Sequence, residues 1–126
     1  MLAPGGRLWL SQPNLASLGL QRFGSDWRGL EPPRHLSLYN FKSLERLLSE
    51  AGFTNIAHLE AERAAHFYFQ QSKAMSEGLD PYRQGDVDWM KTLAVEAAAA
   101  DRKARKNREM AESLSVMAYK PATSAR

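Results

Sequence analysis

The chain has 126 residues, of which 44% are hydrophobic and 25% are charged, and this length and composition predict one domain with one hydrophobic core. It contains no cysteine, which excludes a disulfide scaffold, cysteine-ligated zinc, iron–sulfur clusters and thiolate catalysis, and fits a reducing compartment. No apolar run approaches the ~20 residues that span a bilayer, and Pro4-Gly5-Gly6 cuts the first apolar stretch short. We therefore expect no membrane helix and no signal peptide, and a cytoplasmic location.

The formal net charge of +3 comes from one short segment. Residues 101–109 hold five basic and two acidic side chains, and the remaining charges of the chain cancel. No aromatic residue is interleaved with the basic ones, so the pattern favours a solvated helix face over contact with nucleic acid.

The first predicted element is a short strand, Arg7 to Gln12, which follows a Pro-Gly-Gly turn and is ended by Pro13-Asn14. Its apolar middle predicts burial on both faces. Residues 15–33 contain three glycines and no sustained period, so we interpret them as a long loop with room for one helical turn. Loops of this length inside compact domains are more often functional than filler.

An amphipathic helix is predicted next. Asn40 can cap it, apolar residues recur at i, i+3, i+4 and i+7 from Leu44 to Ala51, and Gly52 stands where a left-handed residue ends a helix. Thr54 to Glu60 is a strand too polar for a central position, which predicts an edge strand.

The second half of the chain contains two helical patterns and a last strand. The first pattern follows Ala61, and its aromatic residues 67–69 are expected in a core or an interface. A longer amphipathic stripe from Val87 to Ala111 predicts the longest helix. Leu114 to Tyr119 predicts a strand, so we expect a single domain over residues 1–121 and a disordered tail over 122–126.

Several kinds of site are absent from the sequence. The three histidines, His35, His58 and His66, include no pair at the i, i+4 spacing of a helical metal site, and we expect no metal. There is no G-x-S-x-G elbow, no P-loop and no G-x-G of any kind, which excludes a serine hydrolase, a P-loop enzyme and a self-contained dinucleotide-binding domain.

Three motifs in residues 2–53 are similar to those of a known enzyme family. They are L-x-P-G-G-R-L-x-L-S-x-P-N at 2–14, F-G-x-D-W-R-G-L-E-P-P-R-H-L-S-L-Y at 23–39 and S-L-x-x-L-L-x-x-A-G-F at 43–53. Together they resemble the C-terminal half of a class I S-adenosylmethionine-dependent methyltransferase, from the branch that acts on small molecules.

The resemblance implies an α/β fold with a partial Rossmann-like methyltransferase sheet. The strands at 7–12, 54–60 and 114–119 would correspond to the fifth, sixth and seventh strands of the family, with an amphipathic helix after the first of them and a long helix before the last. S-adenosylmethionine would be the cofactor of the complete fold, but its glycine-rich turn and ribose-binding carboxylate belong to the family's N-terminal half. We therefore expect no cofactor-binding residue in this chain and no activity from the chain alone.

The resemblance also implies acceptor-binding roles for Asn14, Trp27, Arg34, His35 and Tyr39. His35 would act as general base on an acceptor hydroxyl, and Arg34 would hold an acceptor carboxylate or phosphate. Structural roles compete with these: Asn14 is a good turn former, Trp27 can form a small hydrophobic plug, and His35 can fix the entry to the following helix through backbone hydrogen bonds.

Family topology places the fifth strand beside a fourth strand, which this chain is not expected to contain. Residues 8–10 would then lie on an unprotected apolar edge. Two hypotheses follow. In the first, the chain is the C-terminal half of a methyltransferase for a small-molecule acceptor, either as a truncated product or as one piece of a split enzyme completed in trans by the N-terminal half. In the second, it is a non-catalytic interaction module that uses the Arg7 to Gln12 edge and the basic helix to bind itself, most simply as a homodimer, or a partner protein.

Overall fold

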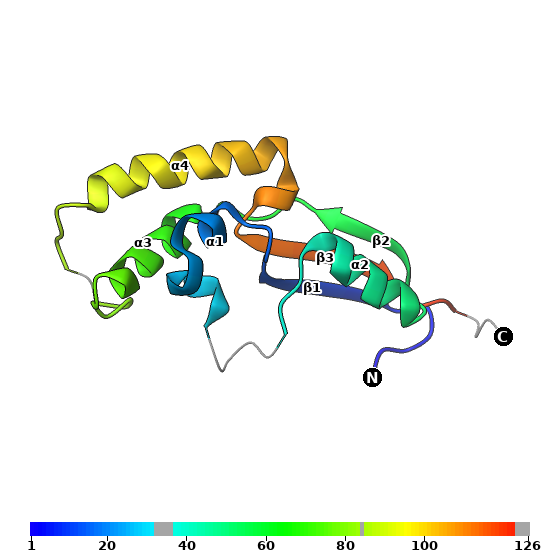
Figure 1. Cartoon of the computed structure of the whole chain (residues 1–126). Helices are drawn as coiled ribbons and strands as arrows, with labels where there is room; N and C mark the ends of the chain where they lie inside the picture. Colours follow the sequence, from blue (N-terminus) through cyan, green and yellow to red (C-terminus); the bar gives the residue numbers. More distant parts are fainter. Residues whose placement is uncertain (32–36, 84, 123–126) are drawn as a thin grey trace.

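A computed structural model describes residues 1–31, 37–83 and 85–122. The chain forms a mixed α/β structure in which one helix lies against a three-stranded sheet and three helices gather at one end of that sheet (Figure 1). In chain order the elements are β1 (Arg7–Pro13), α1 (Leu18–Phe23), α2 (Phe41–Glu50), β2 (Thr54–Leu59), α3 (Ala65–Ser76), α4 (Met90–Lys106) and β3 (Ser113–Tyr119), with short 3-10 turns at Gly24–Asp26, Arg28–Leu30 and Arg108–Met110.

The sheet is antiparallel, with β3 in the middle and β1 and β2 at its edges. The register of β1 runs from Arg7 opposite Tyr119 to Pro13 opposite Ser113. The last strand of the chain therefore joins two strands that precede it by many residues. The prediction that the second strand lies at an edge is confirmed.

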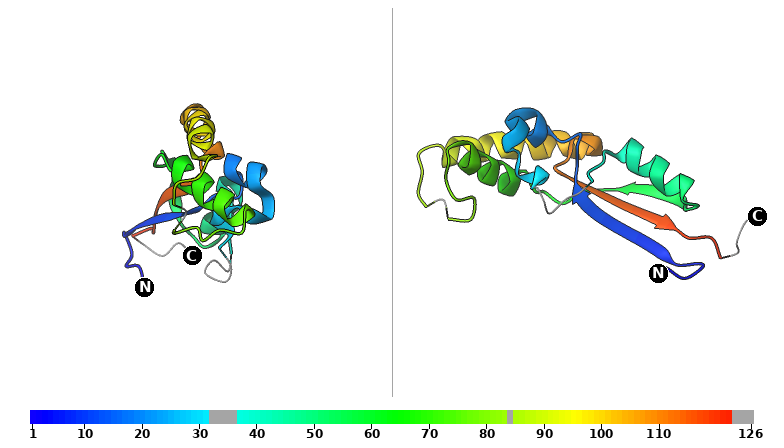
Figure 2. Two further views of the ribbon diagram at one scale, coloured as in Figure 1. Left: turned by 90° about the vertical axis from the view of Figure 1, so that its left-hand side faces the viewer. Right: turned by 60° about the horizontal axis from the view of Figure 1, so that its bottom comes forward.

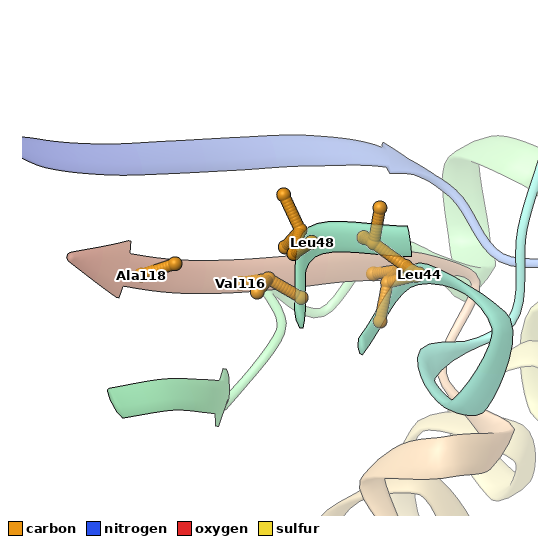
Figure 3. Packing of buried hydrophobic residues seen from close by; sticks show 5 residues of the cluster. Leu44, Leu48, Val116 and Ala118 are labelled. Atoms are coloured by element: carbon orange, nitrogen blue, oxygen red, sulfur yellow. The ribbon is translucent and has the colours of Figure 1, made fainter. Parts of the chain in front are cut away.

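The helix α2 covers one face of the sheet, and its local signals act as predicted. Asn40 caps it by accepting a 2.9 Å hydrogen bond from the Ser43 backbone N–H. At the other end Gly52 adopts φ 92°, a left-handed conformation that suits glycine, while the Phe53 N–H bonds back to Leu48. Figure 3 shows the resulting core, in which side chains of α2 meet those of β3: Leu44, Leu48, Leu114, Val116 and Ala118.

The opposite face of the sheet is open, and the prediction that the first strand is buried on both faces is wrong. In β1, exposed Arg7, Trp9 and Ser11 alternate with half-buried residues, and Trp9 is 60% exposed. Ala57 of β2, which pairs with Met117 of β3 from the other edge of the sheet, is also exposed. Because α2 packs on one side only, an apolar strand here is half-buried.

A second hydrophobic cluster lies between α1, α3 and α4, so the single core expected from length is divided in two. Small residues on α4 let α3 approach it, and the buried members are Ala65, Phe69, Leu93, Ala97 and Ala100. The ring of Phe23 from α1 meets Phe69 edge-on at 5.3 Å. Figure 2 shows these helices at one end of the sheet, separate from α2. The predicted loop at 15–33 thus contains α1 and two 3-10 turns within its described residues.

The longest helix, α4, ends at Lys106 and not at Ala111 as its stripe predicted. Asn107 leaves the helical conformation and its side chain accepts a hydrogen bond from the Glu109 N–H, which starts a 3-10 turn. Within the described part of the chain no helix is long and apolar enough to cross a membrane. The predicted tail lies, from residue 123 onward, outside the described residues.

Candidate functional site

Asn14 follows the carboxyl end of β1 and links it by hydrogen bonds to the start of the next loop and to the segment that leads into β3. Its side-chain amide donates 2.8 Å hydrogen bonds to the carbonyls of Glu109 and Ala111, and its side-chain oxygen accepts one from the Ala16 N–H. Its own backbone N–H donates to Glu112. The side chain is 1% exposed and its hydrogen bonds stay within the protein, as the alternative role of turn former predicts.

Trp27 is fully buried and faces a buried acid. Its indole N–H donates a 3.0 Å hydrogen bond to Glu112, whose other oxygen accepts the Gly19 backbone N–H at 2.9 Å. The Tyr68 ring stacks on the indole at 5.7 Å. Gly19 and Gly29 lie beside this contact, and neither position has room for a side chain. A Cβ on Gly19 would lie 1.8 Å from a Glu112 oxygen, and one on Gly29 would lie 2.3 Å from the indole ring.

Burial changes the acidity of two groups in this contact. The pKa of Glu112 is raised to about 7, mainly because burial disfavours its charged form, while the hydrogen bonds from Gly19 and Trp27 oppose the rise and Asp101 adds to it. Burial also raises the pKa of Tyr68, and the nearby Glu112 carboxylate adds to that effect. A carboxyl group that titrates near neutrality therefore lies directly beneath the 15–31 loop.

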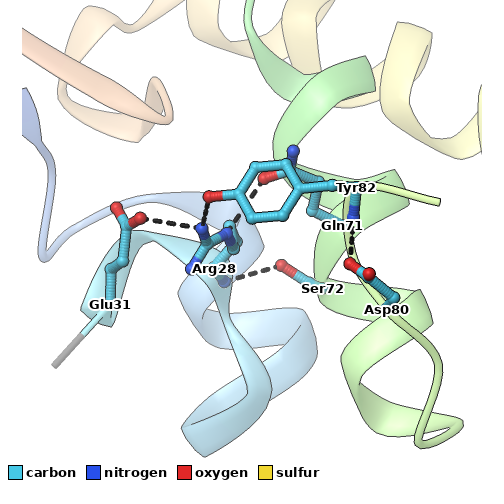
Figure 4. Close-up of polar contacts among 6 residues, drawn as sticks. All are labelled: Arg28, Glu31, Gln71, Ser72, Asp80 and Tyr82. Atoms are coloured by element: carbon cyan, nitrogen blue, oxygen red, sulfur yellow. Dashed lines mark hydrogen bonds and ion pairs between the residues drawn. The ribbon is translucent and has the colours of Figure 1, made fainter.

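Arg28 continues the loop and fastens it to α3, as Figure 4 shows. Its backbone N–H donates to the Ser72 hydroxyl at 2.8 Å, and its guanidinium donates to Gln71 at 3.0 Å and to Glu31 at 2.7 Å. The guanidinium also contacts the Tyr82 hydroxyl and lies over the Tyr82 ring. The guanidinium of Arg28 thus links the loop to the helix α3 and to the segment that follows α3.

The structure brings together only part of the predicted acceptor site. Asn14 and Trp27 both contact the segment that leads into β3, and Tyr39 forms an isolated bridge with Asn14 while its side chain packs against the sheet core. Arg34 and His35 lie outside the described residues. The roles of all five in binding an acceptor stay predictions.

Sequence reasoning missed Glu112, Gly19 and Arg28. The one local signal for Glu112 is an acid directly before the apolar run that forms β3, where a solvated position is the simpler expectation. Gly19 and Arg28 carry no local signal, because their roles depend on partners far along the chain.

His58 is held by packing. Its ring stacks on Phe41 at 4.3 Å, and burial, followed by the charge of Arg108, lowers its pKa. Its Nε2 atom and the Gln12 side-chain amide are buried and, in the part of the chain that is described, have no hydrogen-bond partner. Across residues 1–31, 37–83 and 85–122, no three His, Cys, Asp or Glu side chains gather closely enough to hold a metal ion.

A hollow of about 300 Å³ opens on the uncovered face of the sheet near the carboxyl ends of β1 and β2. Trp9 and Ser11 line it from β1, Ser113 and Ser115 from β3, and Glu60 from the end of β2. Aromatic, hydroxyl and carboxylate groups therefore surround a space next to the end of the strand that leads into Asn14.

Comparison with known proteins identifies the first part of the chain. Residues 1–58 match a family model described as a methyltransferase domain. The predicted resemblance to a methyltransferase is confirmed for this segment, which contains β1, α1, α2 and nearly all of β2. Searches of curated proteins and of solved structures gave no match.

Proposed function

We propose that this chain forms the acceptor side of an S-adenosylmethionine-dependent methyltransferase and that methyl transfer requires a second part that holds the cofactor. The match over residues 1–58 is the observation that carries the proposal. That span includes β1, the loop that follows it and all five of the predicted acceptor-binding residues.

The position of the loop supports an acceptor-binding role. Ligands of open α/β sheets bind beyond the carboxyl ends of the strands, and residues 15–31 follow the carboxyl end of β1 directly. Contacts of Trp27 with Glu112 and of Arg28 with Gln71 hold this loop in place. Methyl transfer depends mostly on holding donor and acceptor in line, so a firmly held loop suits the task.

The described residues do not fit the cofactor by themselves. S-adenosylmethionine would supply the methyl group, and its binding needs a glycine turn between a strand and a helix and a carboxylate for the ribose hydroxyls. Here Gly5-Gly6 precede β1, and the connection from β1 to α1 contains buried Asn14 and Ser17 in place of glycine. The connection from β2 to α3 contains no glycine.

The edge of β1 supports completion by another strand. In the described part of the chain β1 pairs with β3 alone, so its other edge carries backbone groups free to bond a further strand. A cofactor-binding part with a strand at this edge would extend the sheet. It would also place the cofactor near the 15–31 loop.

Calorimetry and coexpression test the proposal. The isolated chain should show no saturable binding of S-adenosylmethionine, and micromolar binding would overturn the assignment of the cofactor to another part. Coding sequence adjacent to the Met1 codon should be searched for an E/D-x-G-x-G-x-G segment and expressed with this chain. Methyl transfer should need both parts, and His35→Gln should reduce it if His35 removes a proton from an acceptor hydroxyl.

A second candidate is a non-catalytic homodimer formed through β1, favoured by the exposed Trp9 on the open face. Sedimentation would then show a concentration-dependent dimer, and Trp9→Lys would dissociate it. Leu47→Lys, at an exposed apolar residue of α2, is the matched control and should leave the dimer intact. A monomer at all concentrations would exclude this candidate.

A further inference from the structure

The last turns of α4 carry a cluster of four exposed cations. Arg102, Lys103, Arg105 and Lys106 are exposed, and none of them forms an ion pair with any described residue. Basic residues elsewhere do so, for example Arg46, which lies 2.9 Å from Glu50. The net charge of the chain is thus concentrated on one helix face.

These four side chains surround a hollow of about 510 Å³, together with Ala99. Two of them are arginines, whose planar forks suit the oxygens of a phosphate. Their positions, 102 to 106, span only about 6 Å along the helix axis. That length fits one phosphate group, whereas a nucleic acid strand would need a longer track of cations.

The hollow has neighbours that lead to the open face of the sheet. Arg105 also lines a narrow depression with Glu60 and Glu62. The same two acids line the 300 Å³ hollow on the open sheet face, beside Trp9 and Ser11. The first two hollows share Arg105, and the second and third share Glu60 and Glu62. The three hollows therefore form a series that runs from the cations of α4 to the carboxyl end of β1.

We propose that the methyl acceptor is a phosphorylated small molecule whose phosphate binds Arg102, Lys103, Arg105 and Lys106 while its reacting end lies toward Trp9 and Ser11. The identity of the ligand as methyl acceptor rests on the proposed function; the phosphate site rests on the cations alone. Repulsion from Glu60 and Glu62 keeps the phosphate out of the second hollow, so the charges orient the molecule.

Phenyl phosphate is the probe, titrated into the full chain and followed by amide chemical shifts in two-dimensional NMR. Saturable shifts should occur at residues 102–106 and near Glu60, and affinity should fall as salt rises. Arg102→Ala with Arg105→Ala should weaken binding at least about tenfold, the size expected from losing charge-assisted hydrogen bonds. Lys42→Ala with Arg46→Ala is the control, on a hollow of α2 that also contains Glu45 and Glu50, and should leave affinity unchanged.

Several outcomes would overturn the phosphate site: no saturable shift at 102–106, equal weakening by the control pair, or equally tight binding of benzoate. A single-stranded oligonucleotide is the second probe. If it bound much more tightly than phenyl phosphate, and if its affinity fell with salt as steeply as contact with several phosphates requires, the ligand of this site would be a nucleic acid and the proposal would be wrong. If phenyl phosphate binds as expected but the coexpressed parts transfer no methyl group, the proposed function fails and the phosphate site stands.

Discussion

The indole N–H of Trp27 donates a 3.0 Å hydrogen bond to Glu112, 85 positions further along the chain. The same carboxyl group accepts the backbone N–H of Gly19, at the start of α1. One buried acid therefore joins the loop after β1 to the residue that precedes β3. The two hydrogen bonds to this acid help to hold the loop in place.

Glu112 should make the folded chain less stable as pH rises through neutrality. Its pKa is about 7 in the folded state against an ordinary value of 4.5, so the folded state binds the proton more tightly. Its contribution is complete below pH 4.5 and is lost as pH rises through 7, a change of about 3 kcal/mol. Glu112→Gln removes this dependence. The free energies of urea unfolding of the two proteins, measured from pH 4.5 to 8.5, should differ least at low pH and diverge as pH rises, because only the wild type must bury a charge.

Glu109→Gln is the matched control for this titration, because Glu109 is exposed and only three positions away. Its unfolding profile should run parallel to that of the wild type. If Glu112→Gln also ran parallel to the wild type across the range, the buried acid would not titrate as described.

Gly19→Ala should destabilise the protein by about 2 kcal/mol or more, because a methyl group must displace the Glu112 carboxylate and the Trp27 indole. Alanine otherwise favours a helix over glycine, so the propensity of α1 alone predicts the opposite sign. Thermal unfolding measures the difference. Gln21→Ala, at an exposed position of the same helix, should change stability by less than about 0.5 kcal/mol, and a neutral Gly19→Ala would refute the tight contact.

Local signals in the sequence predicted α2 in full. Asn40 caps the helix and Gly52 ends it, and both act through residues within five positions of themselves. The antiparallel position of β3 between β1 and β2 has no such signal. It depends on pairings between strands that lie many residues apart.

Burial of β1 could not be read from its own residues. The run Leu8-Trp9-Leu10 is apolar on both faces, yet only one side meets a helix. Whether a second layer covers a strand depends on what the rest of the protein supplies. The burial of Glu112 could not be predicted for the same reason, because its two hydrogen-bond donors come from residues 85 and 93 positions earlier.

Asn14→Ala should destabilise the isolated chain by about 2–4 kcal/mol, because three side-chain hydrogen bonds are lost and two backbone carbonyls lose a buried partner. Asn40→Ala, which removes the exposed cap of α2, should cost only about 1 kcal/mol. Chemical unfolding of both variants gives the comparison. Unchanged stability of Asn14→Ala would mean that the residue serves binding and not the fold.

Arg28→Lys should loosen the attachment of the loop to α3 without unfolding the protein. A lysine keeps the charge but has one nitrogen in place of the fork that reaches Gln71, Glu31 and Tyr82. We expect a loss of about 1–2 kcal/mol and faster amide hydrogen exchange in residues 79–83. Arg46→Lys, in an exposed pair with Glu50, should change stability by less than about 0.5 kcal/mol and leave exchange there unaltered. If both variants showed the same exchange in 79–83, the guanidinium would not be what holds that segment.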